Sequence, residues 1–290
     1  PPTPTRLFPS AWRGWAKPQV NLRGTDGLPA VPGVEPGNIG AFTLTDKAAA
    51  ELKDRVLGIV ETERGSVTGM AEMYIGTMHG YTLDLVQRLV PETFKYQVLT
   101  DITARMLVDR NSKKSGLTEC PTSSPNTPFL KRYTGSRLYL QAMGVLREDD
   151  VDTEQVPDGV LESYRKYATL LNEHAYFDYT QMILTAVGLL EAEPDDGPAE
   201  KVVLDHIRSD IKYVVVDEYQ DVNPLQERLI RGLIRYGANL CVVGDDDQTI
   251  YQWRGSEVSN IVTFAERYDG VEQVPLADNF CSSNGLVKLL

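Results

Sequence analysis

Cysteine and histidine are scarce in this sequence, with three of each among 290 residues. The cysteines, Cys120, Cys241 and Cys281, are widely separated and odd in number, so we expect no disulfide framework. Such cysteine usage is typical of proteins that work in a reducing compartment. With so few histidines we also expect no metal site built from cysteine and histidine side chains.

Long apolar runs are also missing. No run approaches the roughly 18 residues that a membrane-spanning helix needs. The N-terminus lacks the charged region and the apolar core of a signal peptide. We therefore expect a protein without membrane association, located in the cytoplasm.

Positive charge is in deficit, with 29 Lys and Arg against 41 Asp and Glu and a net charge of -12. A protein that coats nucleic acid through bulk electrostatics carries the opposite sign. A local nucleic-acid groove remains compatible with this total, because acidic side chains on other faces outweigh a small basic channel in the sum.

Residues 1–37 differ in composition from the rest of the chain. They hold many of the prolines and glycines, two of the three tryptophans and little apolar periodicity. We predict an irregular segment here.

From residue 38 onward, short apolar runs alternate with segments of helical periodicity. Strands are expected at 38–43, 73–77, 213–217, 238–245 and 270–280, and helices at 45–61, 79–90, 100–109, 129–146, 158–172, after 223 and at 258–268. The alternation predicts an α/β fold with a mostly parallel sheet and helices on both faces. Residues 38–92 and 173–290 would form this domain, and residues 93–172 a mainly helical insertion.

Two helix starts carry capping residues. Asn223 is a favoured N-cap and Pro224 suits the first helical position. Thr45 or Asp46 can cap the helix that follows the first strand, and the sequence leaves that choice open.

An apolar run ends at two adjacent carboxylates in YVVVDEYQD, residues 213–221. Ligands of open parallel sheets bind beyond the carboxyl ends of the strands. A carboxylate at that place can hold Mg²⁺ through water, and its neighbour can activate the water that attacks a γ-phosphate. The alternative is that Asp217 and Glu218 merely end a buried strand.

A second polar segment, GDDDQTIYQWRGS at residues 244–256, follows one helix and one strand later. Gln248 can donate to a phosphate or a water. Tyr251 and Trp253 suit stacking on bases, and Arg254 suits a backbone phosphate. The alternative is a tyrosine and tryptophan pair that packs under a loop.

These two segments resemble motifs II and III of the UvrD/Rep-type superfamily 1 DNA helicases. Four more segments resemble the family's TFTNKAA, GTFH, FDDLL and NYRS strings, namely TLTDKAAAEL (43–52), IGTMHG (75–80), FDYTQMI (177–183) and LADNFCSS (276–283). All six stand in the family's order, and the resemblance covers residues 33–290. Six ordered motifs, one of them long, are highly specific.

The resemblance implies a RecA-like motor domain that uses ATP and Mg²⁺. By position, Asp217 would hold Mg²⁺, Glu218 would activate the hydrolytic water, and Gln248 would sense the γ-phosphate. The implied DNA path is lined by Thr43, Leu44, Thr77, His79, Tyr251, Trp253 and Arg254. For His79 a purely structural role is the alternative.

The resemblance also implies the function of the N-terminal part of an ATP-dependent 3′–5′ DNA helicase. Its substrate would be single-stranded DNA, or DNA with a 3′ single-stranded tail, and a second motor domain would belong to the full-length protein. Two alternatives stand beside it: a non-catalytic module that binds single-stranded DNA or a partner through the same surface, and an unrelated nucleotide-binding fold.

Three departures from the family bear on activity. The phosphate loop, GxxxxGK[ST], should precede TLTDKAAA by some twenty-odd residues, and no such string occurs in the chain. Cys281 stands where the family has an arginine, and a thiol cannot replace a guanidinium. Leu44 replaces a phenylalanine on the DNA path. We therefore expect impaired ATP turnover in this chain.

The missing loop has a further interpretation in the coding frame. Read one base upstream, the codons for AWRGWAKPQ, residues 11–19, can encode GLAGVGKT, a complete phosphate loop. Its lysine would fall near position 17, where the family places it. We hypothesise that the first residues, up to about residue 30, are read out of frame. The alternative is coincidence within a degenerate code.

Overall fold

The computed structural model describes residues 6–8, by their backbone alone, and residues 34–64, 67–149, 151–245, 261 and 263–274. The chain divides into two compact units. Unit 1 comprises residues 1–81 and 190–290, and unit 2 comprises residues 82–189. The boundaries fall inside two helices, α3 (Met78–Leu89) and α7 (Tyr179–Glu191).

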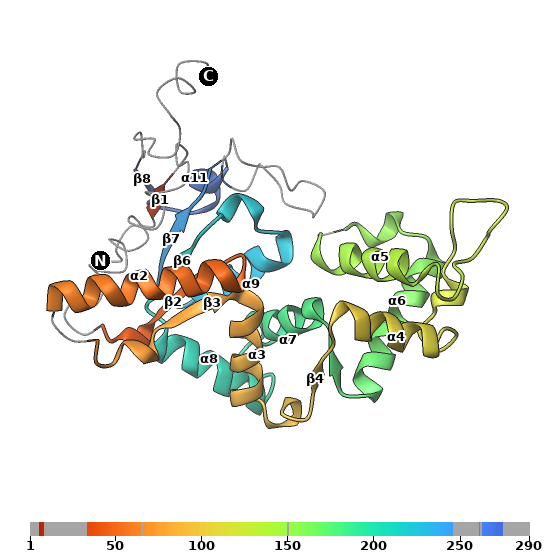
Figure 1. Ribbon diagram of the computed structural model, residues 1–290, viewed down its shortest axis with the longest axis horizontal. Coiled ribbons are helices and arrows are strands. Elements are labelled where there is room, and N and C mark those ends of the chain that lie inside the picture. Colours follow the sequence, from red (N-terminus) through yellow and green to blue (C-terminus); the bar gives the residue numbers. More distant parts are fainter. Residues whose placement is uncertain are drawn as a thin grey trace, which may run out of the picture. The chain divides into compact units, whose positions relative to one another are not determined.

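A six-stranded sheet forms the centre of unit 1, in the order β3-β2-β6-β7-β1-β8 (Figure 1). Its strands are β1 (Arg6–Phe8), β2 (Ile39–Thr43), β3 (Tyr74–Thr77), β6 (Tyr213–Val216), β7 (Asn239–Val243) and β8 (Glu272–Gln273). Every pairing in it is parallel. Four helices of this unit flank the sheet: α2 (Asp46–Arg64), α8 (Pro198–Asp210), α9 (Pro224–Ile234) and α11 (Phe264–Arg267). The predicted α/β fold class, with a RecA-like parallel sheet, is confirmed.

The start of α2 settles which residue caps it. The Thr45 hydroxyl accepts a hydrogen bond from the Ala48 backbone N–H at 3.2 Å, so Thr45 takes the capping position before Asp46. The helix buries an apolar stripe in a core shared with β2 and β6, made by Ile39, Ala41, Leu52, Val56, Val60, Met70, Met73 and Val215. This stripe repeats at helical spacing, which is why the helix could be predicted from the sequence.

The predicted cap of α9 is also confirmed. The Asn223 side chain accepts from the Gln226 backbone N–H at 2.9 Å, and the Gln226 side chain accepts from the Asn223 backbone N–H at 3.1 Å. Pro224 is the first helical residue. This reciprocal capping box satisfies two backbone donors at the helix start.

The prediction of an irregular N-terminal segment is wrong at Arg6–Phe8. These residues form β1, which lies between β7 and β8 and pairs with both. A three-residue strand is too short to show periodicity. Its partners are more than 230 residues away in sequence, so only the tertiary structure brings the ladder together.

Unit 2 is mainly helical. It contains α4 (Asp101–Arg110), α5 (Ser136–Glu148), α6 (Asp158–Glu173) and a small parallel pair, β4 (Gln97–Val98) with β5 (Tyr176–Phe177). Two buried tyrosines, Tyr139 and Tyr167, meet edge to face at its core, with ring centroids 6.0 Å apart. Among the residues that the structure describes, no helix is both long and apolar enough to span a membrane.

Candidate functional site

A row of polar side chains lies at the carboxyl edge of the sheet in unit 1. Thr43 pairs with Thr77 across β2 and β3. The Asp217 backbone N–H donates to the Phe42 carbonyl at 2.9 Å, which places Asp217 next to the end of β2. Because all the strands are parallel, this edge is the one where open α/β sheets bind their ligands.

The same edge extends past β7 to the N-terminal strand. Val242 pairs with Val216, so Val243 is level with Asp217. Phe8, the last residue of β1, pairs with Val243. β1 therefore ends beside the end of β7, at the edge that carries Asp217.

The two adjacent carboxylates leave β6 through an unusual backbone turn. Glu218 has φ 53° and ψ 43°, in the left-handed region, which costs a non-glycine residue about 1–3 kcal/mol. The Asp217 carboxylate accepts a hydrogen bond from the Glu218 backbone N–H at 3.0 Å. Both side chains are half-buried. The turn directs the chain out of the sheet directly after Asp217.

Gln220, which was not among the predicted site residues, joins this turn to the end of β7. Its side-chain amide donates to the Glu218 carboxylate at 2.6 Å. Its carbonyl oxygen accepts from the Asp245 backbone N–H at 3.0 Å. Gln220 is only 1% exposed. A polar residue two positions after Glu218 in YVVVDEYQD was the available signal, but burial cannot be read from it.

The start of α3 carries Thr77 and His79. The Thr77 hydroxyl accepts from the Gly80 backbone N–H at 3.2 Å and so caps the helix. Burial lowers the pKa of His79, and the nearby charge of Asp46 partly opposes this shift. The His79 imidazole is therefore neutral at pH 7.

Thr43 and Leu44 occupy different environments. Thr43 is buried, and its hydroxyl donates to the Thr45 carbonyl at 3.1 Å. Leu44 is 38% exposed, although leucine is an apolar residue. Leu44 is thus open to a ligand, while the Thr43 side chain holds the turn into α2.

Four predicted residues of the second polar segment, and one departure from the family, lie outside the described residues. They are Gln248, Tyr251, Trp253, Arg254 and Cys281. Their roles in phosphate sensing and DNA stacking stay predictions.

Tyr219, directly after Glu218, anchors the turn on a buried acidic side chain. Its hydroxyl donates to the carboxylate of Glu227 on α9, which is 6% exposed. Tyr268 and Arg267 donate to the same carboxylate, each at 2.8 Å. Burial, followed by the charge of Glu227, raises the pKa of Tyr219, so the phenol stays protonated as a donor.

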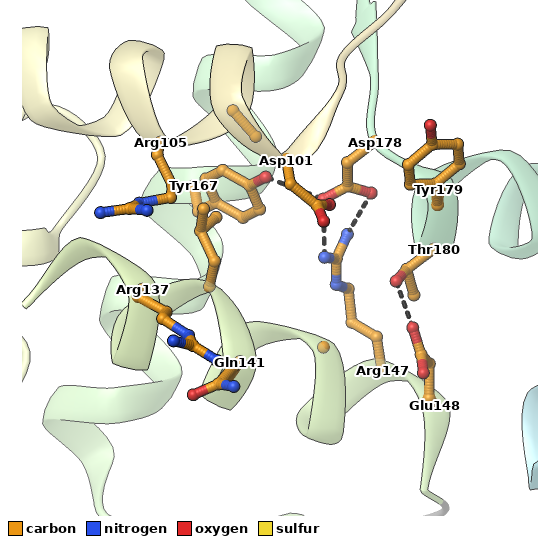
Figure 2. Close-up of a pocket in the computed structure, with 13 residues that line it drawn as sticks. Asp101, Arg105, Arg137, Gln141, Arg147, Glu148, Tyr167, Asp178, Tyr179 and Thr180 are labelled. Carbon is orange, nitrogen blue, oxygen red and sulfur yellow. Dashed lines mark hydrogen bonds and ion pairs between the residues drawn. The ribbon is translucent and has the colours of Figure 1, made fainter. Parts of the chain in front are cut away.

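The FDYTQMI segment has a structural explanation within unit 2. Asp178 accepts two hydrogen bonds from Arg147 and one from the Tyr167 hydroxyl, as Figure 2 shows. It also caps α7, because the Gln181 backbone N–H donates to it at 2.7 Å. This network lies beside a pocket of about 490 Å³. The segment therefore marks a buried ion pair at a helix start.

A comparison with protein families matches residues 30–269 to the UvrD/REP helicase N-terminal domain. The chain belongs to this family. The resemblance inferred from the ordered motifs is thereby confirmed, and the row at the carboxyl edge lies inside the matched region.

Curated relatives agree with this assignment. The proteins named ATP-dependent DNA helicase PcrA are 29% identical over 262 residues in Staphylococcus epidermidis, 28% over 287 residues in Bacillus subtilis and 27% over 262 residues in Staphylococcus aureus. These matches cover 88%, 97% and 88% of the chain, and 33%, 36% and 33% of the relatives. The chain thus spans about a third of their length.

Proposed function

We propose that this chain is the N-terminal motor portion of an ATP-dependent DNA helicase that moves 3′ to 5′ along single-stranded DNA. One observation carries the proposal: the adjacent carboxylates of Asp217 and Glu218 leave the sheet in the same row as Thr43 and Thr77. Family membership, and relatives named as ATP-dependent DNA helicases, support it. The substrate is single-stranded DNA or DNA with a 3′ single-stranded tail, and a second motor domain completes the full-length protein.

The edge residues fit an Mg²⁺ site of the kind that accompanies ATP. Among the residues that the structure describes, no cluster of three or more His, Cys, Asp or Glu side chains forms a metal cage. One or two carboxylates suffice for Mg²⁺, which keeps several waters and binds the phosphates of its nucleotide. Asp217 would hold this ion. Glu218 would orient and deprotonate the attacking water, and Gln248 would contact the γ-phosphate.

The DNA path uses the neighbouring part of the same edge. Leu44 is exposed there, and Thr77 and His79 lie at the start of α3. The Thr43 hydroxyl donates to the Thr45 carbonyl and so stabilises the turn into α2. Tyr251, Trp253 and Arg254 supply base stacking and a phosphate contact, because an aromatic face accepts any base and a guanidinium any phosphate.

A motor of this kind needs a phosphate loop to bind the phosphates of ATP. The chain has no GxxxxGK[ST] string. The edge at which β1 ends is where a phosphate loop would lie, since such a loop connects a strand to a helix at the carboxyl edge of the sheet. β1 ends at that edge beside β7. Sequencing the coding DNA for residues 9–20 decides the matter, because codons that cannot yield Gly-Lys-Thr one base upstream exclude the out-of-frame hypothesis.

Hydrolysis and DNA binding test the proposal on the chain as it stands. We expect little or no ATP turnover, with or without single-stranded DNA. We expect single-stranded DNA to bind, and Trp253→Ala to weaken binding by about 1–3 kcal/mol. Phe94→Ala, which removes an exposed aromatic side chain of unit 2, is the matched control and should bind like the wild type.

Two outcomes would contradict parts of this proposal. DNA-stimulated hydrolysis at the rate of an intact motor, abolished by Glu218→Gln, would refute the expected impairment and leave the motor function standing. Unchanged DNA affinity in Trp253→Ala would remove Trp253 from the path.

A second function, a non-catalytic module that binds single-stranded DNA, is favoured by the missing phosphate loop and by Cys281. Nucleotide titration of the DNA complex separates the two functions. If Mg-ATP leaves DNA affinity unchanged while DNA still binds, the chain acts as the binding module.

A further inference from the structure

The side-chain amide of Gln220 forms hydrogen bonds at both its nitrogen and its oxygen. Its nitrogen donates to the Glu218 carboxylate at 2.6 Å, and its oxygen accepts from the Asp245 backbone N–H at 3.0 Å. Gln220 is 1% exposed and Asp245 is 3% exposed. The bond to the Asp245 N–H is therefore shielded from water, where a lost partner is costly, and the bond to the half-buried Glu218 is partly shielded.

The orientation of this amide is determined by its two partners. A carboxylate can only accept a hydrogen bond, and a backbone N–H can only donate one. A primary amide is uncharged, donates at its nitrogen and accepts at its oxygen, so it matches both partners. Turning the amide over would face oxygen with carboxylate and nitrogen with N–H, so one arrangement holds.

Close packing at Gly244 limits how far Gln220 can move. A Cβ atom at Gly244 would lie 2.6 Å from the Gln220 side-chain oxygen and 2.6 Å from a methyl group of Ile261. A side chain at position 244 therefore requires the Gln220 amide or the Ile261 side chain to shift.

We propose that Gln220 is a positioning residue that couples the Glu218 side chain to the backbone at Asp245, at the start of the second polar segment, residues 244–256. The functional consequence rests on the proposed function, in which Glu218 acts on the hydrolytic water and that segment contacts DNA. A change in the hydrogen bonding of the Glu218 carboxylate then reaches the start of the DNA-contacting segment through one rigid amide. Because coupling is reciprocal, movement of Asp245 also reaches Glu218.

Coupling predicts a response that two independent hydrogen bonds do not. If the amide only fills space, removal of the Glu218 carboxylate leaves the Asp245 N–H bonded as before. If the amide couples the two sites, the same removal frees the Gln220 nitrogen and loosens the bond at its other end.

Residue-resolved amide hydrogen exchange by NMR tests this on the chain itself. We expect Gln220→Met, which keeps the length of the side chain and loses both bonds, to speed exchange of the Asp245 amide by roughly 5–10-fold. Glu218→Ala should speed it by roughly 2–5-fold in the wild-type background. In the Gln220→Met background, Glu218→Ala should add nothing.

A second variant keeps the test valid if Gln220→Met does not fold. Glu218→Gln retains an oxygen that accepts from the Gln220 amide and removes only the charge. Its Asp245 amide should stay protected, whereas the Asp245 amide of Glu218→Ala should exchange faster. The Gln226 amide is the matched control, because its acceptor is also a side chain, that of Asn223, and its exchange should stay unchanged.

The proposal is overturned if Glu218→Ala leaves Asp245 exchange unchanged in the wild type, or if it speeds exchange equally in the Gln220→Met background. Neither measurement needs ATP or DNA. Absent DNA binding would therefore refute the proposed function and leave this coupling to be judged on its own data.

Discussion

The Arg147 guanidinium donates two hydrogen bonds to the Asp178 carboxylate, at 2.9 and 2.7 Å, and both side chains are largely buried. The same carboxylate accepts from the Tyr167 hydroxyl at 2.8 Å. Arg147 lies on α5, Tyr167 on α6, and Asp178 starts α7 (Figure 2). One carboxylate thus ties three segments of unit 2 together.

Asp178→Asn should destabilise the protein by about 3–5 kcal/mol, because it leaves a buried guanidinium without its counter-charge. Asparagine caps helices as well as aspartate does, so the cap of α7 is retained and the loss reports the charge. The free energy of unfolding in urea at pH 7 measures the effect. The exposed pair of Arg228 and Glu191 provides the control, and Glu191→Gln should cost no more than about 1 kcal/mol.

The pair of Arg147 and Asp178 makes the free energy of unfolding depend on pH in the acid range. Burial alone would raise the pKa of Asp178, but the Arg147 charge and the hydrogen bonds it receives hold that pKa below its usual value. A lowered carboxyl pKa contributes stability above the unfolded value of about 3.9, and this contribution is lost as the pH falls through the folded pKa. The difference in free energy of unfolding between wild type and Asp178→Asn should therefore become smaller in strong acid. A difference that stayed constant would contradict the lowered pKa of Asp178.

His79 should make unfolding depend on pH in a higher range. Burial lowers its pKa in the folded protein, so the unfolded chain binds a proton first as the pH falls below about 6.5. Neutral His79 therefore makes its full contribution to the free energy of unfolding above that pH. The contribution decreases as the pH falls toward the pKa of His79 in the folded protein. Unfolding free energies at pH 7.5 and 5.5 should differ more for the wild type than for His79→Gln. Equal differences would show that His79 does not titrate in this way.

Gly244→Ala should destabilise the protein by about 1–3 kcal/mol, because its Cβ would lie 2.6 Å from the Gln220 side-chain oxygen. Gly58→Ala is the matched control. A Cβ at this exposed position of α2 meets no atom within 4 Å, so alanine there should stabilise the helix by about 0.5–1 kcal/mol. Thermal unfolding of both variants checks the opposite signs, and two shifts of the same sign would refute the packing described at Gly244.

Glu227→Gln should loosen α11 from α9. The Glu227 carboxylate accepts from Tyr219, Tyr268 and Arg267, and a hydrogen bond to a charged group contributes about 1.5–3 kcal/mol. Amide hydrogen exchange should speed up over residues 263–268 and stay unchanged in α2. Uniform acceleration across unit 1 would mean that Glu227 supports the whole unit instead of this contact.

Much of the fold was predictable because the decisive signals are local. The cap at Asn223, and the apolar stripes of α2 and α9, lie within a few residues of the helices they define. Of the two candidate caps of α2, Thr45 and Asp46, only the structure selected Thr45. The start of α5 was predicted seven residues early, at residue 129 instead of Ser136. The chain reaches Ser136 through Tyr133, which has φ 67°, a left-handed conformation that apolar periodicity does not reveal.

The sequence by itself determined the alternation of strands and helices, the family, and the place of the two carboxylates after β6. These signals can be identified from the order of residues in the chain alone. The tertiary structure alone decided the place of β1 beside β7, the two-ended role of Gln220 and the buried pair of Arg147 and Asp178. Each of these depends on partners that are distant in sequence, or on burial. Hydrogen bonds between such groups arise only when the packed sheet and helices bring them together and exclude water.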